Sequence, residues 1–365
     1  MQKQRLIFPH NLEQALNDEL ALCPCDRRFV LVDETTRQLC LPLVSNFACL
    51  DGAEVITIPA GDDHKSLQSV SHVWQELQRL SATRRSLLIN LGGGMVTDLG
   101  GFAASTFKRG LRFINIPTTL LAMVDASVGG KTGFNFGGLK NEVGLFSDAR
   151  SVVIATCFLR TMDRQNLLSG YAEMLKHGLI GRHADVRQDS SAASDDEAMW
   201  AELLTFDLEA PDLDVLSRMI RDSVDVKERI VMSDPTEQGL RKALNLGHTV
   251  GHALESLALK TSKPVLHGYA VAWGLVCELY LSCIKCGFPV SQMRQTVSFI
   301  TQLYGRMTIT CNDYPTLLSL MSHDKKNLTA GEINFTLLGG IGDVHINQTA
   351  TREEIEEALD FLREG

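Results

Sequence analysis

The stretch LLINLGGGMVTDLGGFAAST, residues 87–106, joins an apolar run to three consecutive glycines and then to a segment of small residues. The apolar run is typical of a buried strand, and the glycines separate it from a helix. This geometry lets backbone N–H groups approach a diphosphate at the N-terminus of a helix. The stretch matches neither GxGxxG, since position 97 is Thr, nor a Walker loop. A tight turn without a ligand is the alternative at this point.

The segments around this unit repeat the alternation of strand and helix. We expect strands over residues 27–34, 54–61, 86–94, 111–119 and 151–158, with a helix over 66–80. Such alternation predicts a mostly parallel, Rossmann-like sheet with helices on both faces. Beyond residue 160 the apolar residues follow a helical period instead. We therefore expect two domains, an α/β nucleotide-binding domain over 1–160 and an all-α domain over 161–365, with a polar exposed loop over 183–199.

Composition excludes several classes of protein. The 365 residues carry a net charge of −9, which argues against a nucleic-acid partner. No segment has about 20 consecutive apolar residues, and the N-terminal residues do not form a signal peptide, so we expect no membrane partner. The nine cysteines are scattered and odd in number, which predicts reduced thiols and a cytoplasmic protein.

Charged residues close to the glycines are the first candidate ligands. Asp98 lies in the first part of the expected helix, where it suits the helix dipole or could hold a hydroxyl or amide of a nucleotide. Residues 116–144 contain six glycines together with Lys131 and Lys140. One lysine on a loop is usually solvated. Two in a loop that can wrap around a ligand favour the binding of an anion.

A second candidate site lies in the helical half, in LNLGHTVGHALE, residues 244–255. His248 and His252 are four residues apart, so on a helix they share one face and could bind one metal ion. The segment lacks the glutamate of HExxH, which excludes a zincin. Two core histidines satisfied by hydrogen bonds are the alternative. Glu173 in GYAEMLKHG and His267 in VLHGYAVAWG favour a three-ligand Zn²⁺ site with an open position.

Further cations accompany these histidines on the same helical segments. Lys176 lies one turn after Glu173, and Arg241 lies one turn before Asn245. The other members of this set are Lys227, Lys325 and Lys326. Solvated surface charges are the alternative, but their position on the segments that carry the histidines predicts an anionic substrate, a phosphate or carboxylate with vicinal hydroxyls.

Seven motifs, in this order, resemble those of the 3-dehydroquinate synthases, a branch of the sugar-phosphate cyclase superfamily. The resemblance extends over residues 60–330. The motifs are GGGMVTDLGGFAAS, IPTTLLAMVDASVGGKTG, LKNEVG, GYAEMLKHG, GLRKALNLGHTVGHALE, LHGYAVAWG and SHDKKN.

The resemblance implies a fold and a reaction. The family has an N-terminal NAD-binding α/β domain and a C-terminal helical domain, uses NAD and a divalent metal (Zn²⁺ or Co²⁺), and is usually homodimeric. It converts 3-deoxy-D-arabino-heptulosonate 7-phosphate into 3-dehydroquinate and phosphate, a step of the shikimate pathway to chorismate and the aromatic amino acids. Transient oxidation, phosphate elimination, reduction and an intramolecular aldol closure make up this lyase reaction.

The resemblance also assigns roles to residues. Glu173, His248 and His267 are then the metal ligands, whereas His252 faces the phosphate of the substrate. The implied NAD site consists of Asp62, Lys65, Gly93, Gly94, Asp98, Thr118, Thr119, Asp125, Lys131, Lys140, Phe158 and Thr161. The implied substrate site consists of Asp125, Lys131, Asn141, Lys176, Lys227, Arg241, Asn245, His252, Lys325 and Lys326, with Arg109 reaching in from a partner subunit.

Some positions depart from the family pattern, and other activities compete with it. Tyr269 stands where a glutamate is usual, and LKNEVGLFS and SDPTE also differ from the common motifs. The alternatives are another sugar-phosphate cyclase (a deoxy-scyllo-inosose or valiolone synthase), a metal-dependent polyol dehydrogenase of the glycerol type, and a protein that binds nucleotide without turnover. Arg241, Asn245 and Lys227 favour an acidic seven-carbon substrate over the other cyclases, while DASVGGKTG disfavours the dehydrogenase.

Overall fold

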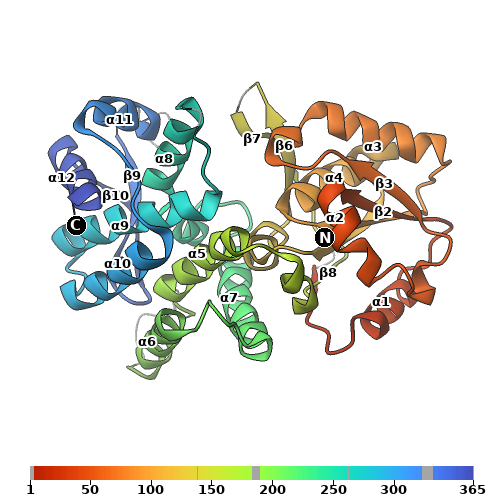
Figure 1. Ribbon diagram of the computed structural model, residues 1–365, viewed down its shortest axis with the longest axis horizontal. Coiled ribbons are helices and arrows are strands. Elements are labelled where there is room, and N and C mark those ends of the chain that lie inside the picture. The colour runs from red at the N-terminus through yellow and green to blue at the C-terminus, as the bar shows by residue number, and fades with distance from the viewer. Residues whose placement is uncertain (1–3, 138, 183–189, 262, 323–331, 365) are drawn as a thin grey trace. The chain divides into compact units, whose positions relative to one another are not determined.

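The computed structural model describes residues 4–137, 139–182, 190–261, 263–322 and 332–364. The chain divides into two compact units, Met1–Asp163 and Arg164–Gly365 (Figure 1). Each unit is described by itself. All nine cysteines lie in the described segments, and none of them forms a disulfide.

The first unit contains a six-stranded parallel sheet with the strand order β1-β8-β5-β4-β2-β3. The strands are β1 (Arg5–Ile7), β2 (Arg28–Asp33), β3 (Glu54–Ile58), β4 (Leu87–Gly92), β5 (Arg112–Pro117) and β8 (Ser151–Val153), and the helices are α1 (Leu12–Ala21), α2 (Glu34–Leu39), α3 (Leu67–Arg79) and α4 (Gly94–Thr106). The predicted parallel sheet is confirmed, and only the three-residue edge strand β1 was not expected.

The chain changes direction across the sheet between β2 and β4. After β2 it continues to β3 on one side, and after β4 it continues to β5 on the other side. Ligands of open α/β sheets bind at the carboxyl ends of the strands at such a switch point. The triple-glycine turn directly follows β4, so it lies at this position.

The glycine-rich segment after β5 is not the open loop that its composition suggests. A π-helical turn, Ala122–Ala126, leads into an antiparallel hairpin of β6 (Lys131–Phe136) and β7 (Leu139–Phe146). Gly133 and Gly144 face each other across the hairpin. A Cβ on Gly133 would lie 2.5 Å from the carbonyl oxygen of Val143, so these glycines permit close pairing of the two strands.

The second unit is built around the helix α9 (Figure 1). Its helices are α5 (Arg164–Ile180), α6 (Ser190–Thr205), α7 (Leu213–Ser233), α8 (His248–Lys260), α9 (His267–Cys286), α10 (Val290–Tyr304), α11 (Tyr314–Ser322) and α12 (Arg352–Glu364). Helix α9 packs against α5, α8, α10 and α12. The predicted helical domain is confirmed.

Two details of this unit differ from the sequence-based prediction. A hairpin of β9 (Asn334–Gly340) and β10 (Asp343–Thr349) adds two strands that were not expected, and β9 packs against α9. The predicted loop over 183–199 is wrong from residue 190 onward, because α6 begins there. The later part of α6 buries Met199, Trp200 and Leu203, and this packing outweighs the polar composition of its start.

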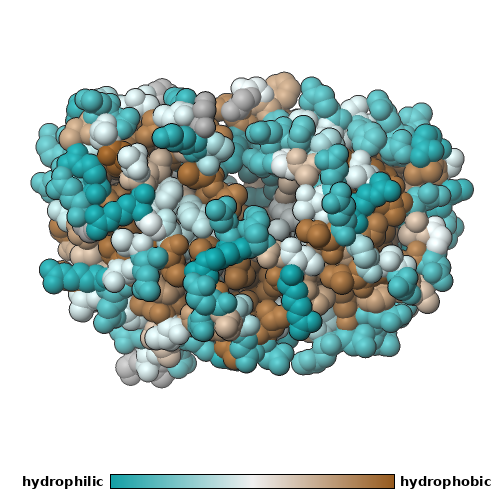
Figure 2. All heavy atoms as spheres, viewed as in Figure 1, coloured by the Kyte–Doolittle hydropathy of each residue, from teal (hydrophilic) through white to brown (hydrophobic). Residues whose placement is uncertain are grey.

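Helix α9 is also the one helix among the described residues that is long and apolar enough to cross a membrane. In this structure 67% of its most apolar window is buried inside the unit, so α9 is a core helix. On the face that Figure 2 shows, hydrophilic residues cover most of the outer surface of this unit.

Glycines let α8 approach α9 closely, and Gly274 provides a test of this packing. An alanine Cβ at position 274 would lie 2.0 Å from the carbonyl oxygen of Gly247 and 2.7 Å from the backbone nitrogen of Gly251. Overpacking costs about 3 kcal/mol where backbone must move, and the higher helix propensity of alanine offsets about 1 kcal/mol. We expect Gly274→Ala to lower the melting temperature by about 4–8 °C.

Thermal unfolding of Gly340→Ala in β9 is the matched control. A Cβ at Gly340 has no atom within 4 Å, so this variant should melt within about 2 °C of the wild type. Equal melting temperatures for the two variants would show that the contact between α8 and α9 does not constrain the unit.

Candidate functional site

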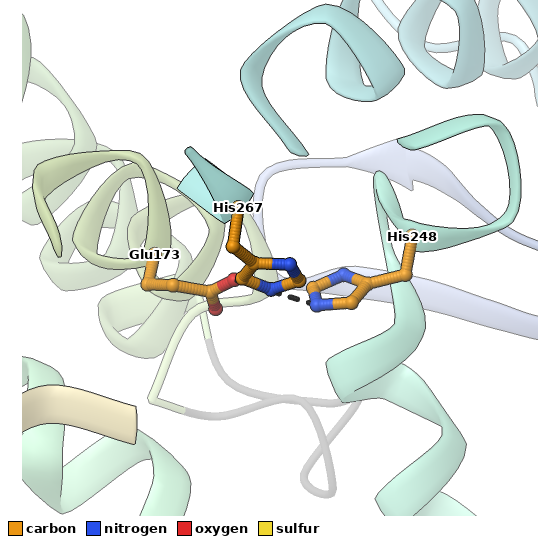
Figure 3. Close-up of side chains that lie close together, drawn as sticks. All are labelled: Glu173, His248 and His267. Atoms are coloured by element: carbon orange, nitrogen blue, oxygen red, sulfur yellow. Dashed lines mark ion pairs between the residues drawn. The ribbon is translucent and has the colours of Figure 1, made fainter. Parts of the chain in front are cut away.

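Glu173, His248 and His267 come from three helices, and their side chains point toward one another (Figure 3). Nε2 of His248 lies 3.4 Å from Oε1 of Glu173, and Nε2 of His267 lies 3.5 Å from the same oxygen. One ligand atom from each residue lies within 4.8 Å of the others. A carboxylate oxygen and two imidazole nitrogens at this separation can surround one divalent cation.

Close packing of small residues brings these three helices together. The backbone N–H of Gly268 donates to Oγ of Ser169 at 3.1 Å, and a Cβ on Gly268 would overlap the carbonyl of Ser169. Ser169 lies one turn before Glu173 on α5, so this contact places the start of α9, with His267, beside Glu173. The close approach of Gly251 to Ala270 likewise holds α8, with His248, against α9.

The carboxylate of Glu173 is the electrostatic centre of the cluster. Its side chain is fully buried, and Lys176, one turn further along α5, forms an ion pair with Oε2. Burial acts to raise the pKa of Glu173, but the ammonium of Lys176 and the two imidazoles hold this pKa well below its usual range. Neither oxygen of Glu173 accepts a hydrogen bond among the described residues. An anionic, buried oxygen pair of this kind fits a metal cation.

The other ring nitrogens of both histidines have polar neighbours. Nδ1 of His267 lies 3.3 Å from Oε2 of Glu255, and Nδ1 of His248 lies 3.0 Å from the carbonyl oxygen of Leu246. A proton on each Nδ1 leaves both Nε2 atoms free to bind a metal. Burial disfavours a charged ring, but hydrogen bonds to Glu173 and Glu255 raise the pKa of His267 to about 10. A metal bound there would compete with that proton.

Glu255 was not among the predicted site residues. It lies seven residues after His248, which is two turns along the same face of α8. The i, i+4, i+7 spacing of His248, His252 and Glu255 in the sequence is the signal that could have revealed it.

His252 lies close to the cluster without joining the contacts of Glu173. Its ring centroid lies 5.3 Å from that of His248 and 5.9 Å from that of His267. Its side chain is half-buried, and its position one turn after His248 leaves it beside the three-residue cluster.

Buried cations are held on the elements next to α5. Lys227 is 7% exposed on α7 and lies one turn after Ser223, whose Oγ lies 2.7 Å from Nδ1 of His177 on α5. The contact places the side of α7 with Lys227 against α5. Arg241, 2% exposed, donates from Nη1 to the carbonyl oxygen of Pro235 at 2.7 Å.

Asp234 shapes the turn that carries Arg241. Its carboxylate accepts hydrogen bonds from the backbone N–H groups of Gln238, Gly239 and Arg241. These bonds outweigh the effect of desolvation and lower the pKa of Asp234. Asn245 follows in the same turn, with its Nδ2 3.4 Å from Oε1 of Glu237. Lys325 and Lys326 lie outside the described residues.

Tyr269, which replaces the usual glutamate, belongs to an aromatic cluster. Its ring packs edge-on against Tyr304 on α10, with centroids 5.1 Å apart, and against Trp273, with centroids 6.0 Å apart. Helix α9 thus gains apolar contacts with α10 two residues after His267.

In the first unit, five predicted residues gather beside the hairpin. Nζ of Lys65, which is 4% exposed, donates to Oδ2 of Asp98 at 2.6 Å and also to Oδ1 of Asn141. Nζ of Lys140 lies 3.2 Å from Oδ2 of Asp62 at the surface. Asn141 has a φ of 51°, a left-handed conformation that its short polar side chain tolerates.

The glycine turn lies against the threonines that follow β5. The backbone N–H of Thr118 donates to the carbonyl oxygen of Gly92 at 3.0 Å. A Cβ on Gly93 would lie 3.0 Å from Cγ2 of Thr119, and α4 has no side-chain cap at its N-terminus. Backbone N–H groups at the start of α4, including that of Gly94, are therefore the groups available to a phosphate.

The remaining predicted residues of this unit lie apart from the Lys65 cluster. The side chain of Phe158 is fully buried in the core, and its carbonyl oxygen accepts a hydrogen bond from Oγ1 of Thr161 at 2.7 Å. Asp125 is half-buried in the π-helical turn, and Lys131 is exposed at the start of β6. Arg109 is exposed in the turn after α4, with a φ of 67°.

Comparison with solved structures places the fold in one class, that of the sugar-phosphate cyclases. A 2-epi-5-epi-valiolone synthase from Streptomyces hygroscopicus subsp. jinggangensis 5008, solved with NAD⁺ and Zn²⁺, has a TM-score of 0.80 at 24% identity, covering 99% of this chain and 97% of its own. A 2-deoxy-scyllo-inosose synthase solved with carbaglucose-6-phosphate, NAD⁺ and Co²⁺ has a TM-score of 0.79 at 20% identity, covering 99% and 96%.

Sequence comparison identifies the branch of this class. Residues 55–169 match the family described as 3-dehydroquinate synthase N-terminal, and residues 170–327 match 3-dehydroquinate synthase C-terminal. The 3-dehydroquinate synthase of Parabacteroides distasonis is 50% identical over all of this chain and 99% of its own length. That of Pyrococcus furiosus is 37% identical over 90% of this chain and 89% of its own. The chain belongs to the 3-dehydroquinate synthase family.

Proposed function

We propose that this protein converts 3-deoxy-D-arabino-heptulosonate 7-phosphate into 3-dehydroquinate and phosphate, a step of the shikimate pathway to chorismate. The buried cluster of Glu173, His248 and His267, in a chain of this family, is the observation that carries the proposal. Its oxygen and nitrogen donors suit a substrate with neighbouring hydroxyl groups, which the reaction requires.

Glu173, His248 and His267 would hold the metal, Zn²⁺ or Co²⁺. A divalent cation bound there would act as a Lewis acid that makes a substrate hydroxyl more acidic. The protein holds the imidazoles ready through the contacts of their Nδ1 atoms with Glu255 and Leu246. Lys176 offsets the charge of the buried carboxylate, so the site persists when no metal is bound.

The NAD site would lie in the first unit. NAD would take up a hydride and return it within one turnover, so the net reaction is redox-neutral. The start of α4 at Gly93 and Gly94 would bind the diphosphate, with Asp98 and the loop of Asp62 and Lys65 next to it. The other residues of this proposed site are Thr118, Thr119, Asp125, Lys131, Lys140, Phe158 and Thr161.

The buried cations of the second unit would bind the anionic ends of the substrate. Lys227 and Arg241 are nearly inaccessible to water, which strengthens their charge-assisted hydrogen bonds to carboxylate or phosphate. Asn245 and His252 would add neutral donors, with His252 on the phosphate side. Asp125, Lys131, Asn141, Lys325 and Lys326 complete the proposed substrate site.

The proposed setting is a cytoplasmic homodimer that has neither nucleic-acid nor membrane partners. Arg109 lies in an exposed, left-handed turn, so in such a dimer it could reach the phosphate in the other subunit. An analytical ultracentrifugation run gives the mass that tests this assembly.

Phosphate release is the experiment that tests the function. We expect the full-length protein with NAD and zinc to release one phosphate per heptulosonate phosphate consumed, without accumulation of NADH. Chelator, or omission of NAD from protein stripped of nucleotide, should stop release. Glucose 6-phosphate tests the scyllo-inosose alternative, and glycerol tests the dehydrogenase. Turnover of glucose 6-phosphate in place of the heptulosonate, or steady NADH formation from glycerol, would overturn the proposal.

A further inference from the structure

One buried acid of α9 has no place in the site described so far. Glu278 interrupts the apolar sequence AVAWGLVCELYL and is fully buried. A carboxylate is almost never fully buried unless its oxygens are satisfied. Its contacts therefore indicate what it does.

Both oxygens of Glu278 bind the backbone at the start of α8. Oε2 accepts a hydrogen bond from the N–H of Gly247 at 2.6 Å, and Oε1 accepts from Thr249 at 3.0 Å and from Val250 at 3.2 Å. The residue before α8 is Gly247, which is in the left-handed region and has no side chain to cap the helix. Glu278 thus does from a neighbouring helix what an N-cap residue does within its own.

The capped turn is the one that carries a proposed metal ligand. His248 is the first residue of α8, and the N–H groups on both sides of it donate to Glu278. The N-terminus of a helix has a partial positive charge, which disfavours a cation bound to His248. The carboxylate of Glu278 offsets this field and also fixes the backbone from which the imidazole extends.

We propose that Glu278 is a positioning residue of the metal site, which holds the first turn of α8 so that Nε2 of His248 faces Glu173. The inference rests on the proposed role of His248 as a metal ligand. It adds a contribution to metal affinity from a residue that touches neither metal nor substrate.

Zinc affinity of the metal-free full-length protein, measured by competition with a chromogenic chelator, tests this role. Glu278→Gln keeps an oxygen acceptor but removes the charge, so we expect affinity to fall about 10-fold to 100-fold, as for other residues that orient metal ligands. Glu278→Ala should lose more. NAD affinity should stay within about twofold of the wild type, since Glu278 contacts α8 alone among the proposed ligand-bearing elements.

Ser282→Ala is the matched control, because Ser282 is buried one turn further along α9 and bonds Leu338 rather than α8. This variant loses a buried hydrogen bond but should keep its zinc affinity and the visible absorption spectrum of bound Co²⁺. Glu278→Gln should change that spectrum. Equal zinc affinity of Glu278→Gln and wild type, equal losses in Ser282→Ala, or failure of Glu278→Gln to fold would overturn the inference. A wild type that binds no zinc would instead contradict the proposed function.

Discussion

The His248→Ala variant is expected to fold and to lose both tight metal binding and turnover. Alanine is a strong helix former, and the substitution removes one hydrogen bond, to Leu246, which contributes about 1 kcal/mol. Metal affinity should fall by more than the roughly 100-fold seen for residues that only orient a ligand. Loss of about 4 kcal/mol of Lewis-acid stabilisation lowers turnover about 1000-fold.

Two measurements on the same preparation separate these effects. Zinc titration by calorimetry gives the affinity without substrate, and phosphate release gives turnover. His345→Ala is the matched control, since His345 lies on β10 and pairs with Asp343. It should bind zinc as the wild type does. Phosphate release by metal-free His248→Ala at near wild-type rate would remove the metal from the proposed function.

The parallel sheet was predictable because its strands are short apolar runs that end at polar or glycine-rich turns. Leu87 to Gly92 is buried at every position, which gives a continuous apolar run. β1 carries the same information in only three residues, too few for a pattern. β9 and β10 were missed because they follow a long series of helices, and only tertiary packing against α9 selects them.

The metal cluster was predictable in composition but not in geometry. Spacing alone joined His248 to His252, since both lie on one face of α8. The structure instead has His248 and His267 in contact with Glu173, each at the start of a helix. The contact of Gly268 with Ser169 produces this arrangement, and no sequence period encodes a contact between residues 99 positions apart.

Residues that act through the backbone escaped prediction for a different reason. Glu278 and Asp234 each accept three backbone N–H groups, which belong to no motif. The sequence shows Glu278 only as a charge in an apolar helix. That conflict between local pattern and burial is itself a signal, because charges placed there need partners.

Replacing Lys176 with methionine should destabilise the metal-free protein far more than the zinc-bound protein. Lys176 is 1% exposed and forms an ion pair with the fully buried Glu173. Methionine keeps most of the packing volume but removes the charge. Breaking a buried pair costs about 3–5 kcal/mol. The raised pKa of His267 keeps its imidazole protonated at neutral pH, so we expect the lower end of this range, about 3 kcal/mol or roughly 6–12 °C.

Thermal unfolding in chelator and in excess zinc measures the difference. Bound zinc supplies the positive charge that Lys176 no longer provides, so most of the loss should disappear in zinc. The double variant Glu173→Gln, Lys176→Met removes both charges and should melt above Lys176→Met in chelator, a coupling that a double-mutant cycle quantifies. If Lys176→Met lost the same stability in chelator and in zinc, and the double variant recovered none of it, Lys176 would be acting through packing alone and would not balance the charge of Glu173.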